Sequence, residues 1–241
     1  MSKTLTYAQR THDSRNPIKR FAHRSRYAAS LSFTDKLLPR GGSIVDFGAG
    51  QGYFLSRLHD VRPDARLIAV EPYMEIASPV IERVAAMDDL AHRSIDLVTA
   101  FETLEHVEDD HLATFLAASD AVLTGQGRLL VTVPIMYGAT LILKEASRAA
   151  IYRHWGDTSA TELLRGTFGR PIARTTERRF SHKGFDFREL RKQIAERFTI
   201  TEIAYSPFPA LPWWLNSQAI FVAVRKPALS AAALDENKVD P

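Results

Sequence analysis

Residues 45–52 read Val-Asp-Phe-Gly-Ala-Gly-Gln-Gly, and this stretch decides the fold of the chain. The apolar run at 43–47 predicts a buried strand, and the apolar spacing of residues 54–61 predicts a helix. Glycine adopts positive φ without steric cost and lets the backbone approach a ligand closely. The sequence therefore predicts a ligand-binding turn between a strand and a helix.

An acidic side chain follows the next predicted strand, which covers residues 66–70. Glu71 lies 25 residues after Asp46, and in a doubly wound sheet these two strand ends are neighbours at the ligand crevice. A carboxylate at that point can accept hydrogen bonds from both hydroxyls of a ribose. The glycine spacing G-x-G-x-G differs from the G-x-G-x-x-G of dinucleotide-binding folds. Asp46 also suits an amino-bearing ligand better than a pyrophosphate.

Strands and helices alternate along most of the chain. Further strands are predicted near 84–87 and at 95–100, 128–133, 199–205 and 219–224, with helices at 27–38, 73–84, 112–123, 139–155 and 187–198. This alternation predicts an α/β fold in which helices cover both faces of a parallel sheet. Residues 1–25 are interpreted as a polar arm, and the Gly-, Thr- and Arg-rich stretch 156–179 as an insertion or lid.

Charge is distributed unevenly along the 241 residues, although the net charge is only +3. Residues 1–40 carry nine basic and two acidic side chains, and residues 136–226 carry fifteen and eight, whereas residues 41–135 carry six and fifteen. The basic segments either form a solvated surface or attract an anionic partner. Neither zinc-finger spacing nor an RNP-type aromatic pattern is found, so nucleic acid is not a favoured partner.

Cysteine is absent from the chain, which excludes a disulfide framework, a thiolate metal site and a cysteine nucleophile. The N-terminal residues carry charges throughout and contain no apolar signal region, which predicts a cytoplasmic location. One uncharged run, 129–143, is 15 residues and is interrupted by Pro134 and Gly138. It is too short and too broken to be a transmembrane helix.

Four stretches together resemble one known family. Residues 46–52 resemble the D-x-G-x-G-x-G motif of class I S-adenosylmethionine-dependent methyltransferases, and residues 69–72 resemble the ribose-binding strand end of that family. Residues 101–107, which contain Leu-Glu-His-Val, resemble the ubiquinone-biosynthesis-type branch, methyltransferase type 11/12. Residues 127–134 resemble the fifth strand. The resemblance covers about residues 40–135, in the order that the family shows.

The resemblance implies a cofactor, S-adenosylmethionine, and a role for each matching residue. Glu71 would bind the ribose hydroxyls, and Asp46 would set the loop or contact the methionine amine. Glycines would line the amino-acid and ribose part of the cofactor. Pro72 or Tyr73 and Met87 would pack near the adenine, and Asp88 or Asp89 would bind the adenine edge. Phe101 and Glu102 would lie below the sulfonium. The glycines concerned are Gly48, Gly50 and Gly52.

Methyl transfer to a poorly acidic hydroxyl requires a general base, for which the chain offers three candidate histidines. His106 follows the fourth strand, and His182 lies in the joint between the predicted lid and a helix. His154 lies beside Trp155. Each histidine also has a structural interpretation, as a capping, packing or surface residue. The sequence shows no metal-ligand cluster and predicts no metal ion.

The Pro- and Trp-rich stretch 207–215 permits two interpretations. It closes the core beside the last two strands, or it forms an exposed apolar flap that contacts lipid or a hydrophobic acceptor. The second interpretation includes a peripheral membrane contact.

The resemblance implies a Rossmann-like class I methyltransferase fold with a seven-stranded, mostly parallel sheet. We expect a basic N-terminal arm and helix at 1–40, a methyltransferase domain at 41–226 with an inserted lid at about 136–182, and a flexible tail at 227–241. The expected reaction is O-methylation of a small or lipid-linked anionic acceptor. The alternatives are a nicotinamide-dependent oxidoreductase and a non-catalytic, methyltransferase-like binding protein.

Overall fold

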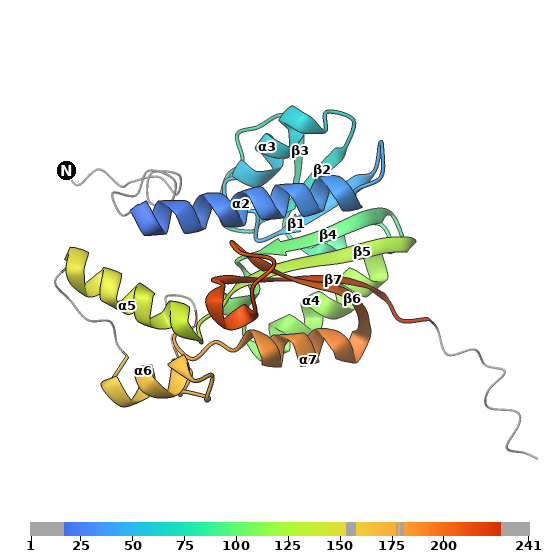
Figure 1. The fold of residues 1–241 in the computed structure, drawn as a ribbon. Coiled ribbons are helices and arrows are strands. Elements are labelled where there is room, and N and C mark those ends of the chain that lie inside the picture. The colour runs from blue at the N-terminus through green and yellow to red at the C-terminus, as the bar shows by residue number, and fades with distance from the viewer. Residues whose placement is uncertain (1–16, 153–157, 177, 179–180, 228–241) are drawn as a thin grey trace, which may run out of the picture.

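The apolar runs of the sequence form one seven-stranded sheet, in the order β3-β2-β1-β4-β5-β7-β6 (Figure 1). The computed structural model describes residues 17–152, 158–176, 178 and 181–227. The strands are β1 Ser43–Phe47, β2 Arg66–Val70, β3 Ile81–Val84, β4 Ile95–Phe101, β5 Leu123–Pro134, β6 Phe198–Ser206 and β7 Gln218–Arg225. Strands β1 to β5 pair in parallel, and β7 runs antiparallel to both β5 and β6.

Helices cover both faces of this sheet, which confirms the predicted fold class (Figure 1). The helices are α2 Pro17–Leu37, α3 Tyr53–Val61, α4 Asp109–Val122, α5 Ala139–Tyr152, α6 Ala160–Thr167 and α7 Phe187–Arg197. Side chains alternate along each strand, so Ile44 packs in the same apolar cluster as Leu55 and Val45 in the same cluster as Phe115. Helices α2 and α3 therefore cover one face, and α4 and α7 the other. Figure 1 shows α5 and α6 extending away from the sheet.

The first helix begins earlier than the sequence predicts. Helix α2 starts at Pro17, whereas residues 1–25 are expected to form an arm. Proline is favoured at the first helical position because its missing N–H has no partner there. Of the predicted arm, residues 1–16 lie outside the described residues, as do residues 228–241 of the predicted tail.

The helix expected at 73–84 is wrong. The segment is irregular up to residue 80 and continues into β3. Two local features prevent a helix. The Glu71 carboxylate accepts hydrogen bonds from the backbone N–H groups of Tyr73 and Met74, and Pro79 disfavours helical backbone at the residue before it.

In the predicted lid, the stretch expected to be irregular contains the short helix α6, whose Ser159 and Glu162 form a capping box.

Candidate functional site

The glycine loop joins β1 to α3 at the carboxyl end of the parallel strands. Gly48, Gly50 and Gly52 adopt φ values of 73°, 56° and 73°, in the left-handed region that favours glycine. The loop is fixed to the neighbouring strand because the N–H of Gly48 donates to the carbonyl oxygen of Val70 at 3.0 Å. The predicted turn is therefore present, directly beside the end of β2.

Glu71 organises this turn with both oxygens of its carboxylate. Oε2 accepts a hydrogen bond from the N–H of Gly50 at 2.9 Å, and Oε1 accepts from Tyr73 and Met74 at 2.8 and 3.1 Å. The residue is 6% exposed. An ionised carboxylate can accept about four hydrogen bonds, so three backbone donors leave capacity for a ligand hydroxyl. Glu71 thus holds the loop and remains able to bind a ligand.

The surroundings of the three glycines test whether a cofactor fits here. A Cβ at Gly48 would lie 2.5 Å from Cγ2 of Thr103, and one at Gly52 would lie 2.9 Å from Cγ2 of Ile76. A Cβ at Gly50 would meet only Sδ of Met74, at 3.9 Å. Gly48 and Gly52 are therefore required by packing, whereas Gly50 borders open space beside Glu71. That space and carboxylate fit the ribose end of S-adenosylmethionine.

Asp46 lies one strand residue before the loop and points toward β4. Its Oδ1 accepts a hydrogen bond from Oγ1 of Thr99 at 2.8 Å, and the residue is 4% exposed. Burial raises the pKa of the Asp46 carboxyl to about 7, against the lowering effect of the Thr99 hydrogen bond. In this structure Asp46 joins the ends of β1 and β4 through its hydrogen bond with Thr99.

The residues expected near the adenine lie at the ends of β2 and β3. Pro72 is exposed, whereas Met87 is buried in the core. Asp89 accepts hydrogen bonds from the backbone N–H groups of Ala85 and Ala86, so its carboxylate is used to close the turn. Asp88 is exposed beside it. Of the two predicted aspartates, Asp88 is the one whose carboxylate this turn does not use.

The end of β4 carries a network that the sequence does not reveal. Glu102 adopts a φ of 50° and forms an ion pair with Nη1 of Arg26 at 2.8 Å. Its other oxygen accepts from Nε2 of Gln218 at 3.1 Å. The ring of Phe101 packs edge-on against Phe54, with 4.5 Å between ring centroids. Helix α2 and strand β7 thereby fix the Glu102 carboxylate, although no local motif connects these residues.

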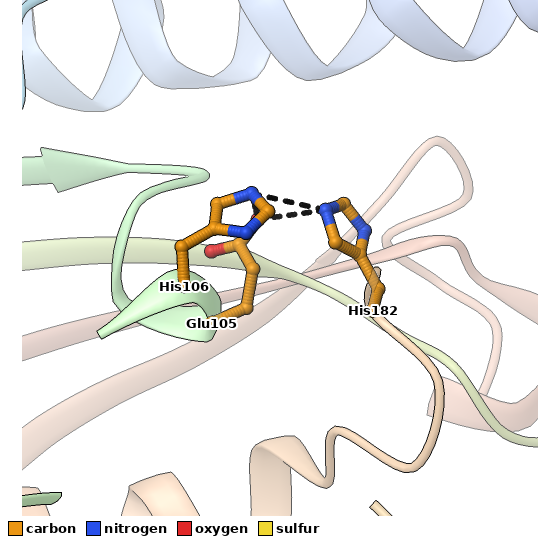
Figure 2. Close-up of side chains that lie close together, drawn as sticks. All are labelled: Glu105, His106 and His182. Carbon is orange, nitrogen blue, oxygen red and sulfur yellow. Dashed lines mark hydrogen bonds and ion pairs between the residues drawn. The ribbon is translucent and has the colours of Figure 1, made fainter. Parts of the chain in front are cut away.

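The two predicted histidines meet in the structure although 76 residues separate them. Nε2 of His182 lies 3.1 Å from Nε2 of His106, and each of these nitrogens lies 3.9 Å from Oε1 of Glu105 (Figure 2). Glu105 and His106 belong to the short 3-10 helix η2, Leu104–His106, whereas His182 precedes α7. The three side chains form a group with metal-ligand spacing, which the sequence analysis did not find because the spacing is not local.

Burial controls protonation in this cluster. Burial, together with the positive charges of Lys144, His106 and Arg26, lowers the pKa of His182 to about 3. Burial also raises the pKa of the Glu105 carboxyl well above its ordinary value, and the neighbouring Glu102 adds to this effect. The third candidate, His154, lies outside the described residues.

The Pro- and Trp-rich stretch packs partly against the core and is partly exposed. Trp213 packs against Phe187 with 5.6 Å between ring centroids, and so closes the core. Phe208, Leu211 and Trp214 are 47%, 42% and 46% exposed. Among the described residues, no helix has the length and apolar character needed to cross a membrane.

The sequence of the chain matches a known protein family. A family profile described as a methyltransferase domain matches residues 19–190. The chain belongs to this methyltransferase family. The match confirms the class I S-adenosylmethionine-dependent methyltransferase predicted from the sequence, together with its cofactor, and the oxidoreductase alternative is not supported. No curated protein matches the sequence.

Solved structures share the fold at low sequence identity. The PH0226 protein of Pyrococcus horikoshii OT3 is 14% identical, with a TM-score of 0.57, and the match covers 92% of this chain and all of that one. The 1,6-didemethyltoxoflavin-N1-methyltransferase of Burkholderia thailandensis is 18% identical, with a TM-score of 0.55 and coverage of 92% and 86%. A type 11 methyltransferase of Sulfolobus solfataricus, described as putative in its published name, is 12% identical, with a TM-score of 0.51 and coverage of 84% and 94%.

Proposed function

We propose that this methyltransferase transfers a methyl group from S-adenosylmethionine to an oxygen atom of a small or lipid-linked anionic acceptor. The bound cofactor supplies an activated methyl group on a sulfonium, so the protein has to position both molecules and exclude water. One observation carries the proposal. The glycine turn and Glu71, at the ends of β1 and β2, form what we call the cofactor cradle, and at the same edge of the sheet Glu105 and His106, which follow β4, meet His182, which precedes α7.

The cofactor cradle consists of the backbone of the glycine turn and the side chain of Glu71. Gly50 borders the open space, and Glu71 offers its remaining acceptor capacity to the ribose hydroxyls. Pro72, Met87 and Asp88 are proposed for the adenine side, and Phe101 and Glu102 for the sulfonium side. This assignment agrees with their positions at the ends of β2, β3 and β4. Resident S-adenosylhomocysteine in the Burkholderia thailandensis relative supports the same cofactor for this chain.

The charges around the histidine pair support an anionic acceptor. Arg26 and Arg174 act electrostatically on Glu105, and Arg26 and Lys144 act on His182. Three cationic side chains near one cluster attract negative charge from solution. A hydroxyl group of such an acceptor would contact His182, whose low pKa keeps the imidazole neutral and which lies against His106. The Lys183 ammonium, next to His182 in the chain, pairs with the carboxylate of Glu162 at 3.0 Å.

An exposed apolar surface supports a lipid-linked acceptor. Phe208, Leu211 and Trp214 are exposed on the loop between β6 and β7, and Phe21 of α2 lies 6.3 Å from Phe208 between ring centroids. Exposed aromatic side chains beside basic residues suit the interface of a membrane. The proposal therefore includes a peripheral contact with a membrane surface. We also propose a cytoplasmic location, and nucleic acid is not a favoured partner.

The proposal is tested by following a labelled methyl group. Purified protein is incubated with S-adenosylmethionine that carries a radiolabelled methyl group, together with water-soluble and lipid fractions of a metabolite extract. We expect label in a product that an anion exchanger retains, with mass spectrometry placing the added methyl on oxygen. Methylation of nitrogen alone would overturn the O-methylation. Cofactor binding without label in any fraction would favour the non-catalytic binding protein.

A further inference from the structure

Glu105 is a buried carboxylate without a hydrogen-bond partner. Its side chain is fully buried, at 0% exposure, and neither Oε1 nor Oε2 has a partner among the described residues. Burying such a group without compensation costs several kcal/mol or more, and buried charges in proteins are normally paired or bound to a metal. The atoms nearest to this carboxylate that can bind a ligand are the Nε2 atoms of His106 and His182, each at 3.9 Å from Oε1.

The backbone fixes the tautomer of His106. Nδ1 of His106 lies 2.8 Å from the carbonyl oxygen of Arg178. A carbonyl only accepts hydrogen bonds, so Nδ1 carries the proton and Nε2 keeps a lone pair. Histidines that bind metals typically donate their other ring N–H to a backbone carbonyl in this way. Nε2 of His106, which carries the lone pair, faces His182 and Glu105 (Figure 2).

We propose that Glu105, His106 and His182 bind a divalent transition-metal ion, with zinc as the best-fitting member. Two imidazoles and one carboxylate form the ligand set of open zinc sites, in which a fourth position remains free. Ligand atoms about 2.0–2.1 Å from a tetrahedral zinc ion lie about 3.3 Å apart. The Nε2 atoms are 3.1 Å apart, and each is 3.9 Å from Oε1. A shift of the carboxylate by about half an ångström would complete this geometry.

Hydrogen bonds of Arg174 and Arg178 support such a site. Nη2 of Arg174 donates to the backbone carbonyl of Glu105 at 3.0 Å, and Nη1 and Nη2 of Arg178 bind the carboxylate of Asp109 at 3.0 and 3.1 Å. The Arg174 contact connects the segment before His182 to η2, which carries Glu105 and His106, and the Arg178 contacts connect it to the start of α4. Glu105 and His106, two of the three proposed ligands, lie in η2, and the third, His182, lies against them.

The free position of the ion would face the proposed acceptor site. An oxygen of the acceptor bound there would be oriented, and its hydroxyl proton would become more acidic. This role refines the one proposed for His182, which would act as a ligand. The role in methyl transfer rests on the proposed function, whereas metal binding does not. Arg26 and Lys144 lie near enough to act on His182 and weaken the attraction for a bare cation. They therefore favour an anionic oxygen as its fourth ligand.

Cobalt and zinc titrations of the full chain test the site. Protein purified without a histidine tag is stripped with EDTA, and Co²⁺ binding is followed through visible absorption and Zn²⁺ binding by calorimetry. We expect one equivalent of each, with the absorption of a four-coordinate cobalt site. His182→Ala and Glu105→Gln should each weaken binding at least about tenfold. His111→Ala, an exposed histidine on α4, is the matched control and should bind as the wild type does.

Two results would overturn the metal site. One is the absence of stoichiometric Co²⁺ and Zn²⁺ binding to the wild type, and the other is wild-type affinity in both His182→Ala and Glu105→Gln. Circular dichroism and the affinity for S-adenosylhomocysteine, measured on the same samples, show that each variant is folded. Loss of metal binding with intact cofactor binding supports the site. Absence of cofactor binding with intact metal binding would contradict the proposed function alone.

Discussion

Replacement of Glu71 by Gln removes one acceptor from the cradle while preserving the size of the side chain. Both carboxylate oxygens accept hydrogen bonds, from Gly50 on one side and from Tyr73 and Met74 on the other. A glutamine amide has one oxygen, so its NH₂ group must face a backbone N–H on one side. The Gly50 donor is the single contact, and we expect the amide to leave that donor without an acceptor.

The magnitude follows from the lost charged interactions. A buried donor left without a partner costs about 1–3 kcal/mol, and we expect the free energy of unfolding to fall by that amount. The ribose hydroxyls would also lose a charged acceptor, worth about 1.5–3 kcal/mol, which corresponds to roughly 10- to 150-fold weaker binding of S-adenosylhomocysteine. Binding is measured by titration calorimetry and stability by thermal unfolding.

The exposed Glu75, four residues further along the chain, provides the matched control. Glu75→Gln makes the same chemical change outside the hydrogen-bonded turn and should leave both quantities at their wild-type values. An S-adenosylhomocysteine affinity of folded Glu71→Gln within about twofold of the wild type, a change below 0.5 kcal/mol, would refute the role of Glu71.

Three further predictions concern the loop, the buried aspartate and the acceptor. Gly50→Ala and Gly41→Ala both place an alanine at positive φ and should each lower the stability by about 1–2 kcal/mol. Only Gly50→Ala should abolish the binding of S-adenosylhomocysteine in calorimetry. Equal binding by both variants would contradict the cofactor cradle. The pKa of Asp46 is about 7 in the folded chain, so ionisation of its carboxyl destabilises the fold as pH rises from about 4 to 7. Over that range the unfolding free energy of Asp46→Asn should gain up to about 4 kcal/mol relative to the wild type. A constant difference between the two proteins in denaturant titrations would contradict the buried charge. Raising the salt concentration from about 50 to 500 mM should increase the KM of an anionic acceptor severalfold and leave the Kd of S-adenosylhomocysteine nearly unchanged, and an unchanged KM in steady-state assays would exclude electrostatic steering.

The sequence predicts the fold wherever local patterns determine structure. Short apolar runs such as 43–47 and 95–100 become β1 and most of β4, because residues of this kind are buried on both faces of a parallel sheet. The glycine turn and the position of Glu71 are also predicted from local patterns, because each directly follows an apolar strand. The helix expected at 73–84 does not form, because a side chain from the preceding residues captures its backbone donors and a proline follows.

The acceptor side depends on contacts between distant residues, which local patterns do not contain. His106 and His182 are 3.1 Å apart in the structure but 76 residues apart in the chain. Arg26 reaches Glu102 across the same separation, from a segment expected to precede the domain. Each histidine was a candidate from its position at a strand end or before a helix. Only the folded chain shows that they share a buried carboxylate.

The most direct test of the cofactor cradle is a crystal structure of the protein with S-adenosylhomocysteine. The ribose hydroxyls should lie within hydrogen-bond distance of the Glu71 carboxylate, and the ligand backbone should pass Gly50. The sulfur should lie near the end of β4, on the side of Glu102. Density for the ligand away from the ends of β1 and β2, or a ribose without contact to Glu71, would contradict the account.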